Sequence, residues 1–181
     1  MDKREMLIVD WTPITETEEV PPLGEELISH LSSYKGVARF ASCSAWNLLY
    51  RLLISIDKQP YHVLFTKAGK PYLRNSDIYF SISHSKDVCA VAVADYPVGI
   101  DVEVIKNNYT PHLLERTLTK NEWEEFDGDF TRIWCRKEAL VKMTGDGIKS
   151  YPFNVDTSGY SFDERKVHYK ESEYWIVSTH I

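Results

Sequence analysis

The sequence predicts an α+β protein with two related lobes. Each half of the chain shows a helical pattern followed by short strand-like runs, which is typical of helices packed on small antiparallel sheets. The chain has 181 residues, of which 43% are hydrophobic, enough for one compact unit with a shared core. We expect residues 1–97 to form the N-terminal lobe and residues 98–181 the C-terminal lobe.

The first half opens with a strand-like run and continues through two helical patterns. A Pro- and Glu-rich stretch separates the strand from a short helix marked by Leu27, Ile28 and Leu31. A broad apolar stripe from 37 to 56 predicts a long, well-buried helix. The strands expected here are 6–11, 62–66, 78–83 and 88–94.

The second half repeats the order of helices and strands. A strand at 98–105 is followed by helical patterns at 111–126 and 130–143. The later strands are expected at 153–155, 160–162, 167–169 and 174–179. Similarity between the halves is too faint, residue by residue, to establish a repeat.

Composition excludes several classes of protein. A net charge of −6 argues against a general nucleic-acid binder, which needs a broad basic surface. Three scattered cysteines suggest neither disulfides nor a thiolate metal site. No apolar run is long enough for a signal peptide or a membrane span, so we expect a cytoplasmic protein.

An acidic pair occurs in the run GIDVEVI, residues 99–105. Strand alternation puts Asp101 and Glu103 on one face and the aliphatic side chains on the other. A partly buried pair of this kind needs a cation or a proton, and hard oxygen ligands favour magnesium or manganese. The alternative is an amphipathic strand whose polar face meets water.

A second pattern lies on the helix expected at 130–143. Trp134, Glu138 and Lys142 are spaced four residues apart and therefore share one face. The structural alternative is a core tryptophan beside an ordinary surface ion pair, which contributes about 0.3–0.5 kcal/mol.

Hydroxyl and imidazole groups follow one another in FSISHS, residues 80–85, shortly after the basic turn KAGKP at 67–71. Such groups suit a phosphate ligand, although hydroxyls here also serve as turn or capping groups. A Ser–His nucleophile is disfavoured because adjacent strand residues point to opposite faces and no G-x-S-x-G turn is present.

Taken in order, GKPYL, FSISHS, GIDVE and WCRKEALVK closely resemble the motifs of the 4'-phosphopantetheinyl transferases. The resemblance runs from about residue 37 to 148 and includes LTKNEW at 118–123. It is closer to the larger class, in which one chain forms two pseudo-symmetric lobes with the active site between them, than to the short trimeric class. A monomer is therefore expected.

The resemblance implies a set of site residues and ligands. Asp101, Glu103 and Glu138 would hold the metal, magnesium or possibly manganese. The residues implied to contact coenzyme A are Arg39, Lys70, Ser83, His84, Lys137 and Lys142. The family's further first-lobe cations, which hold the 3'-phosphate, have only Lys35 and Arg39 as matches here, and Ser81 stands where the family often has Asn.

The activity implied is metal-dependent transfer of 4'-phosphopantetheine from coenzyme A to a serine of an apo acyl or peptidyl carrier protein, with release of 3',5'-ADP. Glu138 would act as general base, and Lys142 would hold phosphate oxygens in line. A carrier would dock near Arg132, Arg136 and segment 106–119. Two alternatives stay open: a metal-dependent phosphodiesterase or nuclease using the same acids, and a non-catalytic lobe that only binds coenzyme A.

Overall fold

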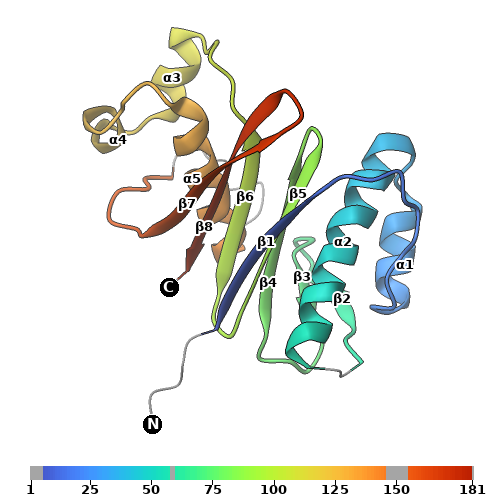
Figure 1. The fold of residues 1–181 in the computed structure, drawn as a ribbon. Helices are drawn as coiled ribbons and strands as arrows, with labels where there is room; N and C mark the ends of the chain where they lie inside the picture. Colours follow the sequence, from blue (N-terminus) through green and yellow to red (C-terminus); the bar gives the residue numbers. More distant parts are fainter. Residues whose placement is uncertain (1–5, 58–59, 146–154, 181) are drawn as a thin grey trace.

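The structure is a computed structural model that describes residues 6–57, 60–145 and 155–180. It is an α+β fold, as predicted, with two three-stranded antiparallel sheets and a two-stranded hairpin (Figure 1). One long helix packs on each three-stranded sheet. None of the described helices combines the length and apolar character that crossing a bilayer requires.

The first sheet has the order β1-β5-β4, and α2 packs on it with α1 beside α2. All seven residues of β5 are buried, because β5 is the central strand of the sheet, and this explains its continuous apolar run. The elements of this half are β1 (Leu7–Pro13), α1 (Glu25–Ser32), α2 (Gly36–Ile56), β2 (Val63–Phe65), β3 (Pro71–Leu73), β4 (Tyr79–Ser85) and β5 (Val88–Ala94).

The second sheet has the order β6-β8-β7, and α5 packs across β6 and β8. The two short helices α3 and α4 lie at the far end of this half (Figure 1). Its elements are β6 (Val98–Val104), α3 (Pro111–Thr117), α4 (Lys120–Glu124), α5 (Phe130–Thr144), β7 (Phe162–Tyr169) and β8 (Ser172–His180).

The two sheets meet where β4 faces β6, and serine side chains bridge them. Ser81 Oγ accepts a hydrogen bond from Ile100 N at 3.1 Å, and Ser85 Oγ accepts one from Val104 N at 3.2 Å. Because these serines alternate along β4, they point to the same side. The serines of FSISHS therefore set the register between the two sheets, a role that the sequence did not indicate.

Three expectations about elements were wrong. The single helix expected at 111–126 is two helices, because Thr119 begins α4 with a capping box that Glu122 completes. The strands expected at 160–162 and 167–169 are one strand, β7. The strand β3 was missed because its first residue belongs to the predicted turn. The strand expected at 153–155 lies largely outside the described residues.

Candidate active site

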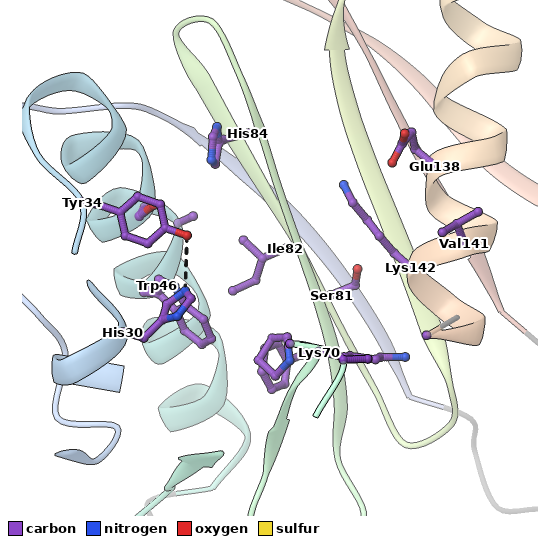
Figure 2. A pocket seen from close by; sticks show the side chains of 17 residues that line it. His30, Tyr34, Trp46, Lys70, Ser81, Ile82, His84, Glu138, Val141 and Lys142 are labelled. Atoms are coloured by element: carbon purple, nitrogen blue, oxygen red, sulfur yellow. Dashed lines mark hydrogen bonds between the residues drawn. The ribbon is translucent and has the colours of Figure 1, made fainter. Parts of the chain in front are cut away.

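A cavity of about 430 Å³ lies between the two helix layers, with β4 along its floor (Figure 2). Helices α1 and α2 and the β2–β3 turn form one side, and α5 forms the other. Its lining residues include His30, Tyr34, Trp46, Lys70, His84, Glu138 and Lys142. Groups predicted from distant parts of the sequence thus share one cavity.

Asp101 on β6 is the most deeply buried acid of this region, with 3% of its surface exposed. Its Oδ1 accepts hydrogen bonds from Ser83 Oγ at 2.7 Å and from Lys142 Nζ at 2.6 Å. Its Oδ2 is buried and has no hydrogen-bond partner among the described residues. The carboxylate therefore has one oxygen available for a further ligand.

The second acid of β6, Glu103, is half-buried and accepts a hydrogen bond from Ser85 Oγ at 2.8 Å. Burial, followed by the negative charge of Asp101, raises the pKa of Glu103 against the opposing effect of the Ser85 hydrogen bond. The pair lies on one strand face, as predicted, and its charges repel each other.

Gly99 brings α5 close enough for its side chains to join these acids. A Cβ on Gly99 would lie 1.9 Å from the Ala139 carbonyl oxygen and 2.7 Å from Met143 N. Only glycine leaves room for this approach of helix backbone to strand backbone. The first letter of the GIDVE motif is therefore a packing requirement.

Glu138 and Lys142 project from α5 toward the strands, one turn apart (Figure 2). Burial, and then the charge of Asp101, raise the pKa of Glu138, while Lys142 partly compensates. Trp134, the third member of the predicted face, packs elsewhere, against Phe130 with ring centroids 6.1 Å apart. The chemistry of this face thus rests on Glu138 and Lys142.

The chemistry of the three acids fits a hard divalent cation. Their carboxylate oxygens are suitable ligands, and one buried oxygen of Asp101 is unpaired among the described residues. Burial, and to a lesser degree the charge of Asp101, raise the pKa values of Glu103 and Glu138, and a cation would offset both effects. However, no group of three His, Cys, Asp or Glu side chains in the described part of the chain is already arranged to hold a metal ion. The amine of Lys142 lies on Asp101 instead.

Two further nitrogen-bearing side chains, those of Lys70 and His84, line the cavity where the sequence predicts phosphate contacts. Lys70 Nζ donates to the Met143 carbonyl oxygen at 2.8 Å, and its side chain lies against Gly145 at the end of α5. His84 reaches the cavity from β4; burial, and then the charge of Lys142, lower its pKa. Ser83 lies beneath the cavity, in contact with Asp101 and Lys142.

Two predicted ligand-binding residues lie elsewhere. Lys137 is fully buried and points away from the cavity, with Nζ 2.7 Å from Glu122 Oε2 and a hydrogen bond to the Val155 carbonyl oxygen. Arg39 donates to the Leu31 carbonyl oxygen and so joins α2 to α1. Neither residue lines the cavity, so their positions do not support the predicted contacts with coenzyme A.

An aromatic end of the cavity was missed. His30 stacks on Phe65 with centroids 4.4 Å apart, and Tyr34 meets His30 edge-on at 5.4 Å. Trp46 of α2 lines the same end. The spacing of four residues between His30 and Tyr34 was the available signal, but it spans the end of α1 and is common on surface helices. The cavity is thus aromatic at one end and charged at the other.

Comparison with known proteins supports the resemblance. The profile of the 4'-phosphopantetheinyl transferase superfamily matches residues 97–173, which include β6, α5 and all three acids. Over residues 97–173 this chain is thus similar to the 4'-phosphopantetheinyl transferase superfamily. The chain contains two three-stranded sheets, one formed by β1, β5 and β4 and the other by β6, β8 and β7; its assignment to the larger class stays a prediction.

Several curated members of the superfamily are similar to this chain. The transferase psf-1 of Bacillus pumilus is 36% identical over 104 residues, 52% of this chain and 44% of that protein. A putative transferase of Haemophilus influenzae is 37% identical over 94 residues, 46% of this chain and 40% of that protein. AcpT of Escherichia coli (strain K12) is 33% identical over 123 residues, 61% of this chain and 63% of that protein. The matches thus cover about half the length of these relatives.

Proposed function

We propose that this chain transfers 4'-phosphopantetheine from coenzyme A to a serine of an apo carrier protein and releases 3',5'-ADP. The main support is the contact between β6 and α5: Lys142 Nζ lies 2.6 Å from Asp101 Oδ1, and Lys142 and Glu138 line a cavity together with Lys70 and His84. Asp101, Glu138 and Lys142 all lie within residues 97–173, which match the profile of the 4'-phosphopantetheinyl transferase superfamily.

The cavity suits an elongated ligand that carries a diphosphate. Lys70, His84 and Lys142 supply positive or hydrogen-bonding groups for phosphate oxygens. The aromatic end around His30, Tyr34 and Trp46 suits the uncharged parts of coenzyme A. Together these groups offer local attraction for an anionic donor in a chain whose net charge is −6.

Asp101, Glu103 and Glu138 are the residues proposed to hold magnesium, or manganese in its place. When bound, the ion would neutralise charge that develops on the diphosphate during transfer. Manganese and magnesium accept the same oxygen ligands, so the proposal does not distinguish them.

Glu138 is proposed to take the proton of the attacking serine hydroxyl. Burial and the charge of Asp101 raise its pKa, which makes it a stronger base than an ordinary glutamate. The serine oxygen then bonds to the phosphorus nearest the pantetheine, and the bond from that phosphorus to the oxygen of 3',5'-ADP breaks. Lys142 would hold the oxygens in line and offset charge on the departing group.

A carrier protein must bind where its serine can reach the acids of β6 and α5. Another cavity, of about 290 Å³, is lined by Glu103, one of the three proposed metal ligands, and by Lys106, Tyr109 and Leu113. These residues belong to the predicted docking segment 106–119. In contrast, Arg132 and Arg136 are paired with Asp127 and Glu164, at 2.9 and 2.5 Å, and are therefore less available to an acidic partner. A cytoplasmic monomer stays a prediction.

The test is to incubate the protein with coenzyme A, magnesium and a panel of apo carriers, and to read the carriers by intact mass. We expect a carrier to gain the mass of phosphopantetheine and an equal amount of 3',5'-ADP to appear only when an apo carrier is present. Release without a carrier would instead support the phosphodiesterase, and binding of coenzyme A with no turnover would support the non-catalytic lobe.

Substitution of the acids should stop the reaction. We expect Asp101→Ala or Glu138→Ala to lower transfer by about 1,000-fold or more, because each removes a group that acts on the reacting centre. Circular dichroism and denaturation would show whether each variant stays folded. Near-normal turnover in a folded variant would contradict the proposal.

A further inference from the structure

Lys142 forms an ion pair with Asp101, one of the acids proposed to hold the metal. Its Nζ lies 2.6 Å from Asp101 Oδ1 and 2.9 Å from Ser83 Oγ, while Ser83 itself donates to the same Asp101 oxygen at 2.7 Å. The aspartate is almost fully buried, whereas 29% of the Lys142 side chain is exposed toward the cavity. The charge balance of this buried acid is therefore provided by a side chain that has room to move.

We propose that Lys142 is a built-in counter-ion that competes with a divalent cation for Asp101 and leaves it when a diphosphate enters the cavity. This inference rests on the proposed function, because it assumes that the cavity takes both ligands. Lys142 would then couple the two binding events. The donor-free protein would hold the ion weakly, and each ligand would strengthen the binding of the other.

The need for a counter-ion follows from the surroundings of Asp101. A buried carboxylate is costly unless it is paired and hydrogen-bonded. Asp101 also shares its site with two acids whose pKa values are raised partly by its charge. Within the described chain, Lys142 is the cation in contact with Asp101, so its amine and a metal ion would meet the same negative centre.

The amine of Lys142 can move readily from one partner to another. Lysine carries a compact charge on a flexible stem, so a modest rotation can take Nζ from a carboxylate to a phosphate oxygen. Asp101 would then need a new cation, which a metal ion arriving with the diphosphate supplies. Because coupling between two ligands is reciprocal, the factor by which the donor raises the affinity for the metal must equal the factor by which the metal raises the affinity for the donor.

The test is to titrate the donor-free protein with Mn²⁺ and to measure the unbound ion by its electron paramagnetic resonance signal. Lys142→Met should bind Mn²⁺ about tenfold more tightly than the unmodified chain, which lies within the usual range of coupling. Lys142→Arg keeps a competing charge and should bind Mn²⁺ about as weakly as the unmodified chain. Lys142→Gln is a second neutral variant in case the methionine variant fails to fold.

Lys70→Met is the matched control, since it removes a positive charge from the same cavity without touching Asp101. Its affinity for Mn²⁺ should stay within about twofold of the unmodified chain if contact with Asp101 decides the effect. An equal gain in Lys70→Met, or no gain in either neutral variant of Lys142, would overturn the proposal.

Calorimetry with coenzyme A then measures the coupling. In the unmodified chain Mn²⁺ should strengthen coenzyme A binding by about tenfold, and Lys142→Met should lose most of this gain. Equal gains in both proteins would overturn the inference. The Mn²⁺ titration needs neither donor nor carrier. An unchanged Mn²⁺ affinity in a chain that transfers phosphopantetheine would overturn the inference alone, and a shifted affinity in a chain that transfers nothing would overturn the proposed function alone.

Discussion

The two lobes share one plan, a helix on a three-stranded antiparallel sheet, but their helices meet the sheets differently. Helix α2 packs through large apolar side chains such as Leu48, Leu49 and Leu53. Helix α5 packs backbone against backbone at Gly99 and carries Lys137, Glu138 and Lys142 within one and a half turns. The first lobe thus provides apolar support and an aromatic wall, while the second holds buried acids and the lysines paired with them.

This difference shows how charges can be held close together inside a small protein. Long side chains between helix and sheet would keep the acids of β6 and the groups of α5 apart, whereas the contact at Gly99 brings them together. The second lobe must then compensate each buried charge by a specific partner. We therefore expect the largest responses to substitution in the second lobe.

The largest expected effect concerns the buried pair of Lys137 and Glu122. Glu122 accepts hydrogen bonds from Lys137, Thr119 N and the backbone and hydroxyl of Thr157, which lower its pKa despite burial. Lys137→Met would leave this acid buried and unpaired, so we expect a loss of about 3–5 kcal/mol in the free energy of unfolding, measured with urea.

A double variant and a first-lobe control sharpen that result. Lys137→Met combined with Glu122→Gln should lose less than Lys137→Met alone, because no unpaired charge remains. Arg51→Met, on the exposed side of α2, should change stability by no more than about 0.5 kcal/mol. A small effect of Lys137→Met would show that the pair does not hold α5 in place.

The next effect concerns the close approach at Gly99. In Gly99→Ala the new methyl group would meet backbone atoms of Ala139 and Met143, which cannot rotate away, so α5 must shift. We expect a loss of about 2–3 kcal/mol and a large loss of transfer, since the shift separates Glu138 from Asp101. Denaturation and transfer assays would measure the two effects.

Gly159→Ala is the matched control for the added methyl group. A Cβ there meets no atom within 4 Å, but the residue has a φ of 83°, so a loss of about 1 kcal/mol from backbone strain is expected. Equal losses at Gly159 and Gly99 would mean that helix–strand packing is not the cause.

Much of the fold could be predicted because its signals are local. The apolar run at 88–94 and the stripe at 37–56 match β5 and α2 closely, since burial on all sides requires such continuity. The break between α3 and α4 was missed because Thr119 and Glu122 act through a capping box inside a helical pattern. The join of 160–162 and 167–169 depends on pairing with β8, which no local pattern reveals.

The site was predictable where a periodicity fixed the direction of a side chain. Strand alternation placed Asp101 and Glu103 on one face, and the spacing of four placed Glu138 beside Lys142. Lys137 follows a different rule, because neighbours on a helix point about 100° apart and only the tertiary structure decides which of them meets the cavity. The aromatic wall comes from α1 and α2, outside the motifs that drew attention.

The smallest expected effect tests whether the ionised carboxylate of Glu138 lowers the free energy of unfolding. Since the fold raises the pKa of Glu138, the ionised form is less stable in the folded than in the unfolded chain. Glu138→Gln should therefore raise the stability of the metal-free protein at pH 7 by about 1 kcal/mol, or ~2–4 °C in Tm, while it abolishes transfer.

The dependence of that gain on pH follows from the same shift. Well below the ordinary value of 4.5 the carboxyl is protonated in both states, so the penalty is absent. It begins as pH rises past 4.5, where the unfolded chain ionises, and is complete above the raised pKa of the folded protein. Calorimetry at pH 7 and at about pH 3.5, roughly one pH unit below the ordinary pKa, should show the gain at the higher pH only. The exposed Glu26→Gln in α1 should change stability by less than about 0.5 kcal/mol at either pH. A gain in Glu138→Gln that persists at low pH would assign the effect to packing, and the contrast between the lobes would then not be one of charge.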